Sequence, residues 1–138
     1  MPPPFYPNSA ALADATAKRA ALALSVVKLF KSGFVPTPDT LVAELDANEC
    51  DYDDYAPATI TAWLAPVNSV GGGSQITAPT TQFTITVDQV VPNTVGGYWV
   101  ELAGGAVQII RQFDAPVPMV NAGNYVQVTP TVVFPNGT

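Results

Sequence analysis

The chain has 138 residues and a formal net charge of −6, with 12% charged residues, no histidine and a single cysteine. This length suits one domain with an extension, which can bury a core without a disulfide or a metal. The lack of histidine excludes the usual Ser-His-Asp and Cys-His catalytic sets and zinc sites that are built on histidine or several cysteines. We therefore expect no catalytic residues, no metal site and no cofactor.

The few basic residues argue against binding to phosphate-rich partners. Four of the five lie before residue 32, and they are spread over two predicted elements. Nucleic acids and anionic membranes both attract clustered cations. The longest apolar run, residues 20–27, is also much shorter than the roughly 20 residues that a membrane-spanning helix needs. We expect neither a nucleic acid nor a membrane as a partner.

Residues 1–8 contain four prolines and two aromatic residues. Proline disfavours a helix interior and a central strand, so this segment is predicted to be an extended, polyproline-like arm. Phe5 and Tyr6 would be exposed on an isolated arm, and we expect them to dock on another protein surface. A disordered tail is the alternative, because chain termini are often poorly ordered.

Residues 9–24 are rich in alanine and predict a helix that Ser9 can cap. Its apolar stripe is thin and includes Leu12 and Leu22. Small side chains on the rest of the surface favour close packing against a neighbour. The segment 1–24 is therefore predicted to be an N-terminal arm and helix that contacts a partner through Phe5, Tyr6, Leu12 and Leu22.

A first strand is predicted over residues 25–30, where β-branched residues begin to alternate. Residues 37–40 (Thr-Pro-Asp-Thr) are typical of a helix start, with proline in the first turn and an acid near the positive end of the helix dipole. The short helix that follows is expected to turn Leu41, Val42 and Leu45 inward.

Residues 46–57 form an acidic, aromatic loop. Its carboxylates are Asp46, Glu49, Asp51, Asp53 and Asp54. They could bind Ca²⁺, but the loop lacks the glycine and the final glutamate of an EF-hand, and a solvated loop is the favoured interpretation. Two carboxylates could also hydrolyse a glycoside if Glu101 or Asp114 lay beside this loop. Cys50 has acidic neighbours, which raise a thiol pKa, so we expect it to be inert.

Residues 98–113 predict a hairpin about Gly104-Gly105. Pairing Ala103 with Ala106 places Val100 opposite Ile109, Trp99 opposite Ile110, Glu101 opposite Gln108 and Leu102 opposite Val107. Residues of like polarity then face each other on both sides of the hairpin, so the register is internally consistent.

Further alternating segments predict strands over residues 58–64, 82–88 and 125–134, with turn residues between them. Six or seven short strands in total are typical of a mainly β fold, and residues 25–138 are predicted to form a β-sandwich or jelly-roll-like domain. Trp63 and Trp99 both lie on predicted strands. They are candidates for a surface contact or a sugar-stacking platform, but core or hairpin packing is the favoured interpretation of both.

Several stretches of the chain resemble small, mostly uncharacterised proteins encoded in the structural gene clusters of tailed bacteriophages. The stretches are residues 27–38, 53–56, 95–100, 113–119 and 133–137. The resemblance extends over most of residues 10–138 and includes no catalytic motif, so it implies a virion structural protein without enzymatic activity.

The resemblance implies a capsid cement (decoration) protein that lies on the capsid surface of the virion. Its partners would be the major capsid protein and further copies of this chain, most simply in a homotrimer. The alternative is a carbohydrate- or receptor-binding β-module of a phage tail or fibre, with Trp63, Trp99 and the acidic residues of the segment 46–54 in the binding site. The role of the N-terminal arm in capsid binding is inferred from its own residues.

Overall fold

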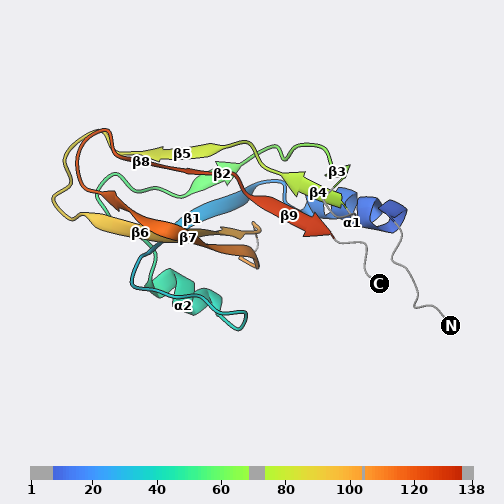
Figure 1. Cartoon of the computed structure of the whole chain (residues 1–138), viewed down its shortest axis with the longest axis horizontal. Coiled ribbons are helices and arrows are strands. Elements are labelled where there is room, and N and C mark those ends of the chain that lie inside the picture. The colour runs from blue at the N-terminus through green and yellow to red at the C-terminus, as the bar shows by residue number, and fades with distance from the viewer. Residues whose placement is uncertain (1–7, 69–73, 104, 135–138) are drawn as a thin grey trace.

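The computed structural model describes residues 8–68, 74–103 and 105–134. In this part of the chain, strands predominate over helices (Figure 1). The elements are α1 (Asn8–Ala21), β1 (Ser25–Lys31), α2 (Val42–Ala47), β2 (Ala58–Ile60), β3 (Val67–Asn68), β4 (Ser74–Thr77), β5 (Thr81–Thr84), β6 (Asn93–Glu101), β7 (Val107–Met119), β8 (Tyr125–Val128) and β9 (Thr131–Phe134).

The described strands form antiparallel sheets with the orders β2-β1-β6-β7, β3-β4-β9 and β5-β8. The strands β5 and β8 lie on one side of the four-stranded sheet and α2 lies on the other (Figure 1). Side chains from every sheet meet in one hydrophobic cluster, which includes Leu29 of β1, Ile76 of β4 and Val126 of β8. The mainly β prediction is confirmed, and the closed sandwich or jelly roll stays a prediction.

A second, smaller cluster covers the opposite face of the four-stranded sheet. Phe30 of β1, Leu45 of α2 and Trp99 of β6 are each fully buried there. Helix α2 therefore shields a sheet face that would otherwise be open to water. As a result, β1 and β6 are buried on both faces, and simple alternation does not describe them.

The predicted β6–β7 hairpin is confirmed in its central register. Val100 lies opposite Ile109 and Trp99 lies opposite Ile110. The register then shifts, so that Glu101 lies opposite Val107 and not opposite Gln108. An extra residue in one strand of an antiparallel pair causes such a shift, and alternation in the sequence does not reveal it.

Helix α1 packs on the body of its own chain. Ala15 and Leu22 are fully buried in the main cluster, and the Arg19 Nε donates a hydrogen bond of 2.8 Å to the carbonyl oxygen of Trp63. Leu22 is therefore not accessible to a partner, and its prediction as a partner contact is wrong. The helix ends at Ala21, three residues before the predicted residue 24, and a turn follows in which Leu24 adopts a left-handed conformation with φ of 63°.

Helix α2 begins later than residues 37–40 predict. These residues form a turn in which the Thr40 N–H donates to the Thr37 carbonyl at 3.0 Å, and the helix starts at Val42. Leu45 is buried as expected, but Leu41 is 65% exposed and Val42 is 40% exposed. The expectation that all three side chains point inward is therefore wrong for Leu41 and Val42.

The remaining strands are shorter than the alternating sequence segments that predicted them. Residues 61–64 and 85–88 lie outside β2 and β5, and Pro130 separates β8 from β9 within the predicted segment 125–134. Strand β8 pairs with β5, whereas β9 pairs with β4, so the two halves of one predicted strand serve different sheets.

Candidate interaction surface

Four exposed valines lie on two adjacent loops at the end of the molecule opposite to α1 (Figure 1). Val87, Val90 and Val91 on the β5–β6 loop are 55%, 87% and 51% exposed, and Val120 on the β7–β8 loop is 36% exposed. We call these four residues the valine tip. Exposed apolar side chains that are grouped in one region are typical of a protein-interaction surface.

Two carboxylates of the acidic loop accept hydrogen bonds from the loop that carries Val87, Val90 and Val91. Oδ2 of Asp54 accepts hydrogen bonds from the backbone N–H and the hydroxyl of Thr86, at 2.9 and 3.2 Å. Oδ2 of Asp53 accepts the N–H of Val90 at 2.9 Å. The backbone between β5 and β6 is thus fixed by side chains that precede it by more than thirty residues in sequence.

The buried Gln89 side chain connects the same two loops. Its Oε1 accepts the N–H of Asp54 at 3.1 Å, and its Nε2 donates to Oδ2 of Asp54 at 3.4 Å. Its own backbone N–H donates to the carbonyl of Val120 at 2.8 Å. A single side chain and its backbone therefore join the acidic loop, the β5–β6 loop and the β7–β8 loop.

The β7–β8 loop has its own polar contacts. Oδ1 of Asn124 accepts the N–H groups of Val120 and Asn121 at 3.1 and 2.9 Å, and Oδ1 of Asp88 accepts the N–H of Ala122 at 2.9 Å. The valine tip is thus ordered before any partner arrives. Preorganisation lowers the entropy that binding must remove.

Asn93 at the start of β6 holds the first part of the acidic loop. Its Oδ1 accepts the N–H groups of Asp51 and Tyr52 at 2.6 and 2.9 Å, and its Nδ2 donates to Oδ1 of Asp51 at 3.0 Å. Oδ2 of Asp51 also pairs with the Lys31 ammonium at 3.2 Å. Asp51, Asp53 and Asp54 are exposed, as expected for a solvated loop, but these contacts also fix their side chains, which that interpretation did not include.

Hydrogen bonding lowers the pKa of two carboxylates of the acidic loop, those of Asp54 and Asp51. The backbone N–H of Thr86 is the main cause that lowers the pKa of Asp54. The side chain of Asn93, followed by that of Lys31, lowers the pKa of Asp51. The valine tip is therefore bordered by negative charge at neutral pH.

The sequence left two alternatives open for the acidic loop, a metal site and a pair of glycosidase carboxylates. Among the described residues, no group of three or more histidine, cysteine or acidic side chains could hold a metal ion. Asp51 contacts Asn93 at the first residue of β6, whereas Glu101 is the last residue of that strand. Eight residues of strand span about 26 Å. Glu101 is therefore too distant to act with Asp51 as a pair of glycosidase carboxylates.

Trp63 and Trp99 are 3% and 0% exposed, so their prediction as surface contacts is wrong. The Trp63 Nε1 donates to the carbonyl of Leu22 at 3.1 Å, and the Trp99 Nε1 donates to Oε1 of Glu101 at 2.7 Å. Trp99 is on the α2 side of the sheet, where the smaller cluster encloses it. Both indoles are structural, and neither offers a face for stacking a sugar.

Three further partner contacts predicted from the sequence are not described by the structure. Phe5 and Tyr6 lie outside the described residues, as does the side chain of Leu12. The valine tip was not predicted, because Val87 lies inside the strand predicted over residues 82–88 and the residues after it were not singled out. The signal that could identify it is the Val-Val-Pro sequence at residues 90–92, where proline ends regular structure beside two apolar residues.

Comparisons with protein-family models, curated proteins and solved structures find no match to this chain. A search of the described helices for a membrane span finds none that combines the necessary length and hydropathy.

Proposed function

We propose that this chain is a non-enzymatic structural protein of a tailed-bacteriophage virion, and that it decorates and stabilises the outer surface of the capsid. The observation that carries the proposal is the valine tip, an exposed apolar surface on loops fixed by side-chain hydrogen bonds. Burying apolar surface from a preorganised loop favours permanent assembly. The resemblance to phage structural proteins agrees with this role.

The charges around the valine tip define the partner surface further. Asp53 and Asp54 contact the loop that carries the tip, and the chain carries a net charge of −6. A capsid surface that offers an apolar site flanked by basic residues would complement it. Such complementary charge speeds association and selects the partner more than it adds affinity.

Copies of the chain are proposed to associate as trimers at symmetry-related positions of the capsid, since oligomers of one chain are generally symmetric. The carbohydrate-binding alternative relies on exposed indoles, and both tryptophans are buried. Capsid decoration is thus the function that the exposed surface of this chain favours.

The direct test uses capsids of the encoding phage that lack this chain. Purified chain is added over a range of concentrations, and the bound fraction is measured by co-sedimentation. We expect saturation at a fixed ratio to the major capsid protein, together with a higher temperature of capsid disruption. Binding to purified tails and not to capsids would contradict the proposal.

The valine tip is tested with the triple variant Val87→Ser, Val90→Ser and Val91→Ser. Each buried valine contributes about 1 kcal/mol or more to an apolar contact, so capsid binding should weaken by at least about tenfold. The matched control is Val67→Ser with Val133→Ser, which alters two valines of similar exposure, 54% and 49%, on β3 and β9. Equal loss in both variants would remove the valine tip from the proposal.

A further inference from the structure

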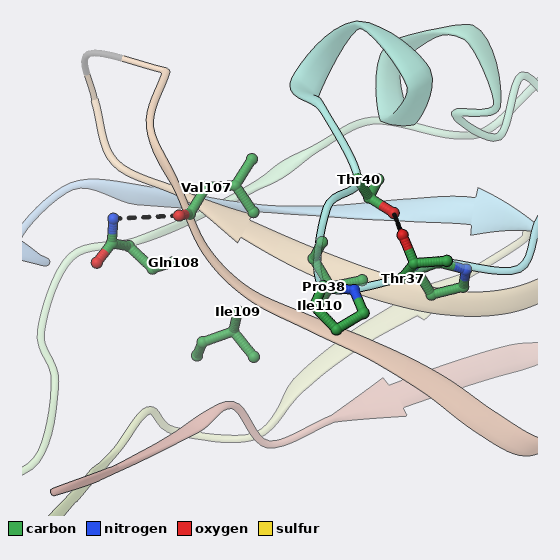
Figure 2. A pocket seen from close by; sticks show the side chains of 8 residues that line it. Thr37, Pro38, Thr40, Val107, Gln108, Ile109 and Ile110 are labelled. Atoms are coloured by element: carbon green, nitrogen blue, oxygen red, sulfur yellow. Dashed lines mark hydrogen bonds between the residues drawn. The ribbon is translucent and has the colours of Figure 1, made fainter.

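A groove lies between the turn that precedes α2 and the start of β7 (Figure 2). Its volume is about 450 Å³. It is lined by Pro36, Thr37, Pro38, Thr40, Val107, Gln108, Ile109 and Ile110. This lining carries no formal charge and combines apolar side chains with two threonines and a glutamine, which suits an uncharged segment with apolar side chains.

The turn that forms one wall is held in shape by its own hydrogen bonds. The Thr37 N–H donates to the Thr40 hydroxyl at 2.7 Å, and the Thr40 N–H donates to the Thr37 carbonyl at 3.0 Å. On the other wall, Val107 and Ile110 pack against the buried cluster of Phe30, Leu45 and Trp99. The groove is therefore present before a ligand binds.

Strand β7 adds a second feature that suits an extended ligand. It is the outer strand of the four-stranded sheet, and in the described part of the chain its far edge has no neighbouring strand in that sheet. The Gln108 Nε2 donates to the carbonyl of Val107 at 3.3 Å, beside the groove (Figure 2). Extended peptides commonly bind along such edges and beside apolar side chains.

We infer that this groove binds residues 1–7 of a second copy of the chain. That segment, Met-Pro-Pro-Pro-Phe-Tyr-Pro, has no charged side chain and offers two aromatic side chains for the groove. Its four prolines favour an extended conformation in the free chain, so little entropy is lost when it is bound. This inference goes beyond the proposed function, because it concerns copies of this chain only and requires no capsid.

The position of α1 favours a second copy over the same chain. The Lys18 Nζ donates to Oε1 of Gln108 at 2.8 Å, so the later part of α1 is anchored beside the groove. Asn8 is ten residues earlier, about 15 Å along the helix axis, and α1 starts at the outer end of the molecule (Figure 1).

Residues 1–7 would have to reverse direction at Asn8 to reach the groove of their own chain. Seven residues in a polyproline conformation span about 22 Å. That length is sufficient to cross to an adjacent molecule.

Disulfide cross-linking between two full-length variants tests the inference. Pro4→Cys is mixed with isotopically labelled Thr37→Cys, and mixed dimers are identified by mass spectrometry after mild oxidation. The native Cys50 is 3% exposed and stays out of the reaction. The control partner is Thr80→Cys, which introduces an exposed thiol between β4 and β5. We expect at least tenfold more mixed dimer with Thr37→Cys than with Thr80→Cys.

The aromatic anchors are tested in the same assay. Adding Phe5→Ser and Tyr6→Ser to the Pro4→Cys variant should reduce the mixed dimer at least tenfold, with an unchanged circular dichroism spectrum. Similar yields with Thr37→Cys and Thr80→Cys would overturn the inference. It would also be overturned if Pro4→Cys and Thr37→Cys, combined in one chain, formed only an intramolecular disulfide. A chain that forms these dimers but does not bind capsids would contradict the proposed function alone.

Discussion

Oδ2 of Asp54 accepts both the backbone N–H and the hydroxyl of Thr86, which lies 32 residues later in the chain. This pair of hydrogen bonds joins the acidic loop to the loop that carries most of the valine tip. The acidic residues thus shape an apolar surface that they do not themselves form. Hydrogen bonds from main-chain N–H groups to a carboxylate are stronger than those between neutral groups.

The order of the valine tip should therefore depend on pH. The pKa of Asp54 in the folded chain is lowered below its ordinary value of 3.8, mainly by the hydrogen bond from the Thr86 N–H. A lowered carboxyl pKa stabilises the folded loop fully above about pH 5, and this stabilisation is lost as the pH falls through the folded-state value. We expect the amide proton of Thr86 to lose protection in acid before those of β1 and β6, as measured by hydrogen exchange.

The variant Asp54→Asn serves as the control for this effect. It removes the ionisable group while retaining a side-chain oxygen that can accept from Thr86. Protection of Thr86 in this variant should be weaker at pH 7 and should change less below pH 5. An unchanged acid response would assign the pH dependence to other carboxylates.

Gly97 on β6 lies too close to its neighbours for any side chain. A Cβ at this position would be 2.1 Å from the carbonyl oxygen of Arg111 and 2.3 Å from Cζ of Phe30. Overpacking of a core typically destabilises by 1–3 kcal/mol, and Gly97→Ala forces movement of both backbone and ring. We expect the free energy of unfolding, measured in urea, to fall by about 2–3 kcal/mol.

Gly33→Ala provides the matched control, since a Cβ there has no other atom within 4 Å. The stability of Gly33→Ala should differ from that of the parent chain by less than about 0.5 kcal/mol. A similar loss in both variants would point to a general effect of replacing glycine and not to contact with Phe30.

The local pattern of the sequence predicts β1 and the centre of the β6–β7 hairpin because both depend on neighbouring residues. The pairing of Val100 with Ile109 follows from the turn and from alternation. The bulge that places Glu101 opposite Val107 does not, since an inserted residue leaves the alternating composition unchanged. Local patterns thus define the type of an element better than its full register.

The candidate site was harder to predict because its contacts are distant in sequence. In the sequence, Asp53 and Asp54 cannot be told apart from residues of an ordinary charged surface loop. In the fold, they bind the N–H groups of Val90 and Thr86. For Trp99 the sequence allowed both a surface contact and core packing, and the packing of α2 on the second face of the sheet places it in the core. In both cases the packing of one segment on another decides the role of a side chain, and composition does not contain that information.

The Cys50 thiol should be unreactive in the folded chain. Its pKa is raised from an ordinary value of 9.0 to about 12, mainly by burial. The nearby Asp51 and Glu49 raise the pKa further, while Lys31 lowers it. Since only the thiolate reacts, alkylation at pH 8 should be at least about a hundredfold slower in the native state than in urea. Equal rates would show that this part of the core opens readily.

Leu22 provides the clearest test of whether α1 belongs to the body of the chain. Its side chain is fully buried in the main cluster, and its carbonyl accepts a hydrogen bond from the Trp63 indole at 3.1 Å. Leu22→Ala should lower the free energy of unfolding by about 3 kcal/mol, because buried leucine-to-alanine changes cost 2–5 kcal/mol. The control is Leu64→Ala, at a leucine that is 54% exposed, which should cost less than about 1 kcal/mol.

The comparison of the two leucine variants also decides how truncations must be interpreted. If Leu22→Ala is strongly destabilising, a chain that starts at Ser25 loses part of its core, and any loss of assembly in that chain reflects unfolding as well as the missing arm. Point changes at Phe5 and Tyr6 then become the valid test of the arm, because they leave Ala15 and Leu22 in place. Equal, small effects of Leu22→Ala and Leu64→Ala would instead show that α1 detaches from the strands in solution, and removal of residues 1–24 would then be a fair test of the arm.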